Sequence, residues 1–162
     1  MCSGKSTVGK LLARELGWEF VDVDEEIERR EGMSIPQIFE RKGEPYFREL
    51  ELEMLRELSS RKQVVVSTGG GLGANPEAMN LMKRRGLVVW LDVSYDTFLE
   101  RCGKDPNRPL LKKSEEELKR LMEDRSRVYS QADVRVKPRK PEEIVDLIIE
   151  KLRGEPHDLS RP

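Results

Sequence analysis

The chain has 162 residues, a length that suits one domain and leaves little room for a second. Its 30 Lys and Arg residues nearly balance 31 Asp and Glu residues, and the formal net charge of −1 excludes a general nucleic-acid binder. No apolar run approaches the ~20 residues needed to cross a bilayer, and the first residues do not read as a signal peptide. We therefore expect a cytoplasmic protein with no nucleic-acid and no membrane partner.

Cysteine and histidine usage narrows the chemistry further. Cys2 and Cys102 cannot make a disulfide framework and form no C-x-x-C pair. The single histidine, His157, falls in a polar tail. These counts exclude a Ser-His-Asp hydrolase and a His-rich metal site.

The first predicted elements are a helix, a short strand and a second helix. Apolar residues at helical spacing indicate a first helix that ends at Gly17, with its inner face formed by Val8, Leu11, Leu12 and Leu16. Residues 20–23 are a strand candidate. Asp24 is predicted to cap the helix that follows, which runs to Arg30.

The next segment contains two helices and a buried strand. Ser34 and Gln37 form a capping box, and residues 46–59 carry an apolar stripe typical of a longer helix. The run 64–66 consists of three valines and predicts a fully buried strand. Three consecutive glycines, residues 69–71, follow that strand.

A strong strand lies in the second half of the chain. Asn75 is predicted to cap a helix that Gly86 ends, and residues 87–93 form the strongest strand candidate. Ser94 or Asp96 opens a helix that reaches about residue 102.

The last segment begins with a loop rich in Gly, Pro and Lys, residues 103–113. A capping box at its end starts a helix over 114–130, followed by a short strand over 134–136 and a helix from 141. The tail, residues 154–162, is expected to be frayed.

Strands that alternate with helices indicate an α/β fold with a parallel sheet covered on both faces. We find no internal repeat and no linker. We therefore expect one domain over residues 1–153 with a mobile lid at about 103–113.

The run Ser3-Gly4-Lys5-Ser6-Thr7 matches the end of a phosphate-binding loop. Gly4 lets backbone N–H groups face phosphate oxygens, Lys5 supplies a charge for the β- and γ-phosphates, and the Ser6 hydroxyl can ligate Mg²⁺. A helix start that reads Gly-Lys-Ser by chance is the alternative.

Only Met1, Cys2 and Ser3 precede Gly4, so neither the usual strand nor the first glycine of the loop is in this sequence. We expect that upstream residues complete both. If the polypeptide starts at Met1, we expect a gap in the sheet, weak stability and weak activity.

Carboxylates follow the first strand candidate. Asp22 and Asp24 lie at its carboxyl end, where ligands bind in open α/β sheets. Two carboxylates there can hold Mg²⁺-bound water and orient an attacking hydroxyl. For Asp24, a simple N-cap role is equally compatible with the sequence.

Glycines and arginines supply further candidates. Three consecutive glycines are costly in conformational entropy and indicate close approach of a ligand or of another segment, with a flexible turn as the alternative. Arg48 and Arg125 suit a buried anion site because guanidinium donors are planar and bidentate. Arg101 and Arg108 flank residues 103–107, and an arginine on a mobile lid can neutralise charge on a transferring phosphoryl group as the loop closes. For each arginine, a solvated surface position is the alternative.

Taken in chain order, these motifs resemble the shikimate kinase family over residues 1–153. The resemblance is carried by Ser3–Thr7, Asp22-x-Asp24, Gly43-Glu44-x-x-Phe47-Arg48-x-x-Glu51, Ser67-Thr68-Gly69-Gly70-Gly71, Arg108-Pro109-Leu110-Leu111, Arg125-x-x-x-Tyr129 and Ala132-Asp133. It implies a P-loop kinase fold with three α/β/α layers, a five-stranded parallel sheet whose first, central strand is absent here, a substrate-binding subdomain at about 25–53, and a monomer.

The resemblance implies transfer of the ATP γ-phosphoryl group to the 3-hydroxyl of shikimate. Asp24 would hold that hydroxyl, Arg48 and Arg125 would bind the carboxylate, and Gly70 and Gly71 would offer N–H groups to the other hydroxyls. Aromatic walls of the pocket would be Phe39 and Phe47.

For ATP and Mg²⁺, the resemblance implies that Lys5 contacts the phosphates and that Ser6 and Asp22 bind the metal ion. Arg108 would reach in from the lid. The remaining nucleotide contacts would be Ser3, Gly4, Thr7, Arg101, Arg139 and Pro141.

Two alternatives stay open on the sequence. One is another P-loop kinase acting on a small molecule or a nucleoside monophosphate. The other is a non-catalytic module that binds a nucleotide or shikimate, silent because its phosphate loop is incomplete.

Overall fold

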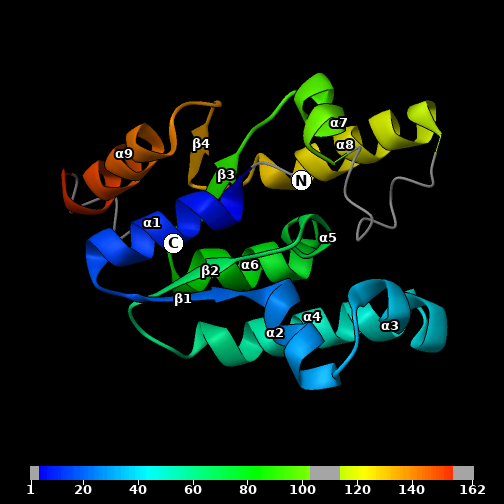
Figure 1. The fold of residues 1–162 in the computed structure, drawn as a ribbon. Coiled ribbons are helices and arrows are strands. Elements are labelled where there is room, and N and C mark those ends of the chain that lie inside the picture. The colour runs from blue at the N-terminus through cyan, green and yellow to red at the C-terminus, as the bar shows by residue number, and fades with distance from the viewer. Residues whose placement is uncertain (1–3, 103–113, 155–162) are drawn as a thin grey trace.

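Helices surround two small parallel sheets in the computed structural model (Figure 1). The structure describes residues 4–102 and 114–154, with Arg101 and Cys102 described by their backbone alone. The strands are β1 (Glu19–Asp22), β2 (Val64–Ser67), β3 (Val89–Leu91) and β4 (Val134–Val136). The helices are α1 (Lys5–Leu16), α2 (Val23–Glu31), α3 (Ile35–Lys42), α4 (Glu44–Ser59), α5 (Gly70–Gly73), α6 (Pro76–Arg85), α7 (Tyr95–Cys102), α8 (Glu115–Tyr129) and α9 (Pro141–Gly154).

The local signals for helix ends are confirmed. Gly17 ends α1 in the left-handed region at φ 71°, which glycine adopts without a steric penalty. Ser34 and Ser114 each form the predicted capping box, at the starts of α3 and α8. Ser94, and not Asp96, caps α7 by accepting a hydrogen bond from the Thr97 N–H. The loop at 103–113 and the tail beyond 154 lie outside the described residues.

The predicted cap of α2 is wrong by two residues. Asp22, not Asp24, is the N-cap, and its Oδ1 accepts the Glu25 N–H at 3.2 Å. The strand ends directly in the helix, so Asp22 still has extended backbone while Asp24 already lies in the first turn. An N-cap needs non-helical backbone, which only Asp22 has here.

The strands form two separate pairs. β1 pairs in parallel with β2, and β3 pairs in parallel with β4. Within residues 4–102 and 114–154 no strand lies between β2 and β3. The α/β class is confirmed. Figure 1 shows the two pairs apart, with α1 lying across the space between them.

Apolar layers cover both faces of these strands. One core cluster joins Val8 and Leu12 of α1 to Ile144 and Ile148 of α9, and Val65 packs against it. The other joins α2, α3, α4 and α6, and both Val64 and Val66 pack against that one. Successive valines of β2 therefore point to opposite layers, as side chains of a strand do.

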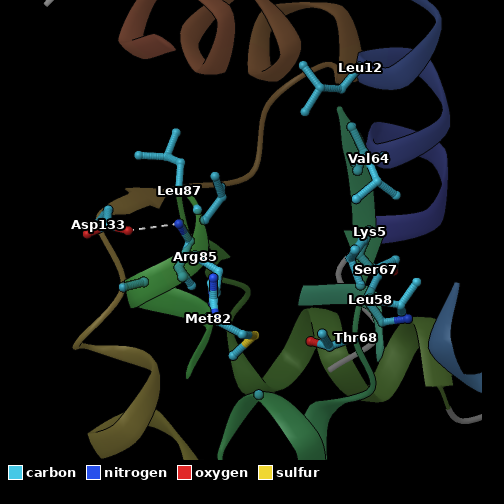
Figure 2. A pocket seen from close by; sticks show the side chains of 18 of the residues that line it. Lys5, Leu12, Leu58, Val64, Ser67, Thr68, Met82, Arg85, Leu87 and Asp133 are labelled. Atoms are coloured by element: carbon cyan, nitrogen blue, oxygen red, sulfur yellow. Dashed lines mark hydrogen bonds between the residues drawn. The ribbon is translucent and has the colours of Figure 1, made fainter. Parts of the chain in front are cut away.

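The prediction that residues 64–66 are fully buried is wrong. Val64, Val65 and Val66 are each only partly buried. In the part of the chain that the structure describes, β2 has a neighbouring strand on one edge alone, and its other edge lines a cavity (Figure 2). Among the described residues, no helix combines the length and apolar character needed to cross a membrane.

Candidate active site

The start of α1 meets the end of β1. Gly4 precedes the helix at φ 81°, and Lys5 is the first helical residue. The Ser6 hydroxyl donates a hydrogen bond to Asp22 Oδ2 at 2.9 Å. The structure thus brings together the two residues predicted to bind a metal ion. Thr7, also in the predicted loop, is exposed.

Asp24 faces the first glycine of the run at 69–71. A Cβ built on Gly69 would lie 3.1 Å from both carboxylate oxygens of Asp24. The alternative of a flexible turn is therefore wrong for Gly69, because the missing side chain is what admits the carboxylate. Gly70 and Gly71 then begin the short helix α5.

Arg48 lies at the centre of the site. Its Nη1 donates to Glu51 Oε1 at 2.7 Å, and its Nη2 donates to Glu44 Oε2 at 3.1 Å. A Cβ on Gly71 would overlap Arg48 Nη1, so the guanidinium lies directly against this glycine. The side chain is 29% exposed and is not a solvated surface arginine.

Two aromatic rings flank the same guanidinium. The ring centroids of Phe39 and Phe47 are 5.1 Å apart, and the Arg48 Cζ lies 5.9 Å and 5.4 Å from them. Cation–π attraction at these distances restricts the position of Arg48. Both rings predicted to form pocket walls therefore lie beside Arg48, the residue predicted to bind the carboxylate of the substrate.

Glu51 is buried beneath Arg48, with 1% of its surface exposed. Burial raises the pKa of this carboxyl to about 7, against the opposing attraction of Arg48, and repulsion from Asp24 adds to the rise. Burial also acts to lower the pKa of Arg48, but attraction from Glu51 outweighs it and the net shift is upward. Arg48 therefore keeps its charge.

Arg125 is the second arginine of the cluster and is 8% exposed. Burial lowers its pKa; attraction to Tyr129 opposes this shift, and repulsion from Arg48 adds to it. Within the described part of the chain, no carboxylate lies within ion-pairing distance of Arg125. Such a cation is stabilised by an anion that brings its own carboxylate or phosphate oxygens.

Tyr129 joins Arg125 to the glycine run. Its hydroxyl donates to the Gly70 carbonyl oxygen at 2.6 Å. Burial raises the pKa of Tyr129 to about 12, with the nearby Arg125 opposing the rise, so the phenol stays protonated and can donate. Its ring also lies 3.3 Å from where a Cβ on Gly73 would be.

The remaining predicted site residues are nucleotide contacts, and the structure describes only some of their side chains. Arg139 is exposed between β4 and α9, and Pro141 begins α9 as expected. The side chain of Arg101 is not among those described, and Ser3 and Arg108 lie outside the described residues. Glu51 and Tyr129 have no predicted role, although both belong to the motifs that carry the family resemblance. Glu51 follows Arg48 by three residues, a spacing that lets two side chains pair on a helix, and this spacing could have pointed to Glu51. Nothing in the sequence pointed to the Tyr129–Gly70 bond.

Sequence relatives point to one family. The chain is 58% identical to a shikimate kinase of Aquifex aeolicus, over 95% of this chain and 92% of that protein. It is 52% identical to a shikimate kinase of Persephonella marina, over 94% of each.

Solved structures give the same result. The fold matches a shikimate kinase from Aquifex aeolicus with a TM-score of 0.85 at 53% identity, over 97% of this chain and 94% of that one. It also matches a shikimate kinase from Acinetobacter baumannii that was solved in complex with shikimate. The TM-score is 0.90 at 38% identity, and the match covers 96% of this chain and 89% of that one. The family model described as shikimate kinase matches residues 1–153, and the chain belongs to the shikimate kinase family.

Proposed function

We propose that this chain transfers the γ-phosphoryl group of ATP to the 3-hydroxyl of shikimate. The observation that carries the proposal is the closeness of two groups of residues. Ser6 bonds to Asp22 at one end, and two positions later Asp24 faces Gly69 of the glycine run, whose Gly71 lies against Arg48. One end has the residue types that bind phosphate and Mg²⁺, and the other has those that bind a carboxylate.

Arg48 and Arg125 bind the carboxylate of shikimate. Arg125 has no carboxylate within ion-pairing distance among the described residues, so an incoming anion supplies the charge that its environment lacks. Glu51 and Glu44 hold the Arg48 fork in place before the substrate arrives. Preorganisation of this kind lowers the cost of ordering the side chain on binding.

Asp24 orients the acceptor hydroxyl and accepts its proton as the new O–P bond forms and the bond from the γ-phosphorus to the bridging oxygen breaks, which releases ADP. Its carboxylate lies in the first turn of α2, between the Ser6–Asp22 pair and the arginine cluster. Phosphoryl transfer needs mainly such positioning, since no covalent intermediate with the protein forms. Gly70 and Gly71 are in reach of the substrate hydroxyls through their backbone N–H groups.

Lys5 and Ser6 bind the phosphates and the metal ion from the start of α1. Oxygen ligands such as the Ser6 hydroxyl and the Asp22 carboxylate suit Mg²⁺, which takes few protein ligands when phosphates supply the rest. When bound, Mg²⁺ neutralises charge that develops on the phosphate oxygens. We further propose that residues 25–53 form the substrate-binding subdomain and that the chain acts as a monomer in the cytoplasm.

The test is shikimate-dependent release of ADP from Mg-ATP. We expect turnover with shikimate and none with its methyl ester, which keeps the hydroxyls but lacks the carboxylate charge. Turnover with a nucleoside monophosphate in place of shikimate would favour a different P-loop kinase. Binding of shikimate without any ADP release would favour a non-catalytic module.

A further inference from the structure

One guanidinium is shared by several carboxylates in the arginine cluster. Among the described residues, Arg48 donates from Nη1 to Glu51 Oε1 at 2.7 Å, and from Nε and Nη2 to Glu44 Oε2 at 3.3 Å and 3.1 Å. A guanidinium has five N–H groups, so these three bonds leave two of them for a ligand. The carboxylate of a bound substrate therefore becomes a further anion on a cation that Glu51 and Glu44 already share.

The two glutamates differ in their surroundings. The side chain of Glu44 is 57% exposed at the start of α4, whereas that of Glu51 is 2% exposed. Water solvates and screens the charge of Glu44, but a carboxylate as buried as Glu51 is costly to keep ionised unless a cation compensates it. A ligand that takes a share of the Arg48 charge therefore acts on Glu51 more strongly than on Glu44.

Charges from three helices act on Glu51. Arg48 of α4 and Arg125 of α8 favour its ionised form, while Asp24 of α2 disfavours it. Together with burial, which is the largest effect, these groups place the pKa of Glu51 at about 7. Its protonation can therefore change near neutral pH. Arg48 keeps its charge there, and the phenol of Tyr129, with a pKa of about 12, stays protonated.

We propose that Glu51 takes up a proton from solvent when shikimate binds beside it at Arg48 and Arg125, a coupling that rests on the function proposed above. An added negative charge disfavours the ionised form of a neighbouring buried carboxylate. The proton binds Glu51 Oε2, so Oε1 continues to accept the Arg48 Nη1–H. The arriving carboxylate and the arriving proton have opposite charges, so the net charge of the buried cluster is the same before and after binding.

This coupling makes the affinity for shikimate depend on pH in a defined direction. Binding favours the protonated form of Glu51, so affinity is highest below about pH 7, where the side chain is already protonated, and falls as the pH rises. A like charge a few ångströms away raises the pKa of a carboxyl by roughly one to two pH units, so the Kd should be about 5- to 20-fold higher at pH 8.5 than at pH 6.5.

The experiment titrates the protein with shikimate in a calorimeter, without ATP. Each titration is run in HEPES and in Tris, which release protons with different enthalpies, so the difference in observed heat gives the number of protons taken up. We expect about 0.4 to 0.8 of a proton per shikimate at pH 8 and almost none at about pH 5.5, where Glu51 is protonated in both states.

Glu51→Gln tests whether this side chain binds the proton. Glutamine has the shape of the protonated acid, and its carbonyl oxygen can still accept from Arg48, so proton uptake should disappear. At pH 8.5 the variant should bind shikimate about 5- to 20-fold more tightly than the unchanged protein. A glutamate that only held Arg48 in place would instead leave the variant weaker at every pH. Glu44→Gln is the matched control and should keep the proton uptake, because Glu44 is exposed.

A direct measurement covers the case in which Glu51→Gln does not fold. The ¹³C resonance of the Glu51 carboxyl should titrate with a pKa of about 7 in the free protein and at a higher pH with saturating shikimate. No proton uptake by the unchanged protein, uptake that persists in Glu51→Gln, or a carboxyl titration that binding does not shift would each overturn the proposal.

These readouts separate proton uptake from phosphoryl transfer. Shikimate that binds with proton uptake but yields no ADP from Mg-ATP would support the coupling and contradict the proposed function. Shikimate that is phosphorylated but binds without proton uptake would contradict the coupling alone. Absence of any shikimate binding would contradict both.

Discussion

The Tyr129 hydroxyl donates a hydrogen bond to the Gly70 carbonyl oxygen over 2.6 Å, joining the last residue of α8 to the first residue of α5. This bond spans 59 positions of the sequence. It holds the glycine run against the helix that carries Arg125. We infer that Tyr129 is a positioning residue that sets the distance between the backbone N–H groups of the run and the buried arginine.

Tyr129→Phe removes this bond and leaves the ring. A neutral hydrogen bond contributes about 1 kcal/mol net, so we expect the KM for shikimate to rise about three- to tenfold with a smaller change in kcat. Steady-state kinetics at saturating ATP measure both values. Tyr46→Phe is the control, because that hydroxyl bonds to Glu31 at an exposed site. An unchanged KM for Tyr129→Phe would contradict the positioning role.

Arg48→Lys should not be a conservative change. A lysine cannot reproduce the fork that contacts Glu51 and Glu44 while a carboxylate ligand binds. We expect the Kd for shikimate to rise about 10- to 100-fold, as for loss of a charge-assisted bond. Calorimetric titration measures it. Arg56→Lys on the same helix, whose ion pairs to Glu49 and Glu77 are exposed, should leave the Kd as it is.

Gly71→Ala should weaken shikimate binding more than it affects folding. The added methyl group would overlap the Arg48 guanidinium, which is the movable end of a long side chain, so the arginine shifts and the fold persists. We expect a Tm close to that of the unchanged protein and a clearly raised Kd for shikimate. Gly86→Ala, which meets nothing within 4 Å, is the control. A normal Kd in Gly71→Ala would show that Arg48 does not contact the substrate.

Stability should depend on pH through Glu51. Its pKa is raised by burial from 4.5 to about 7, so between these values the folded state binds a proton that the unfolded state has released. Proton binding by this carboxyl therefore stabilises the folded state. As pH rises from about 5 to 7 this contribution is lost, and the free energy of unfolding falls by up to about 3 kcal/mol.

Glu51→Gln should remove that part of the pH dependence. Urea unfolding at several pH values between 5 and 8 measures the slope for each variant. Glu49→Gln, an exposed position on the same helix, should keep the slope of the unchanged protein. Identical slopes for all three proteins would mean that Glu51 is ionised throughout.

Asp22→Asn separates capping from metal binding. Asparagine caps helices as well as aspartate does, so the bond to the Glu25 N–H persists and stability should change by less than about 0.5 kcal/mol. The lost charge should raise the Mg²⁺ concentration needed for half-maximal activity. A Mg²⁺ dependence equal to that of the unchanged protein would exclude Asp22 from the metal site.

The sequence by itself determined most of the helix ends, the α/β class and the family. Gly17, Ser34 and Ser114 act through bonds within a few residues, so their roles can be read locally. The residue types of the site were also predictable, because phosphate, Mg²⁺ and carboxylate each require particular donors.

Tertiary structure decided which of these residues meet and what covers them. The Asp24–Gly69 contact, the position of Arg48 against Gly71 and the Tyr129–Gly70 bond all join segments that are distant in the chain. The partial burial of residues 64–66 was not foreseen, because three valines read as a buried strand whether or not both edges have neighbours. Burial and the pKa of Glu51 depend on what the rest of the chain places around a side chain, and no local pattern encodes that.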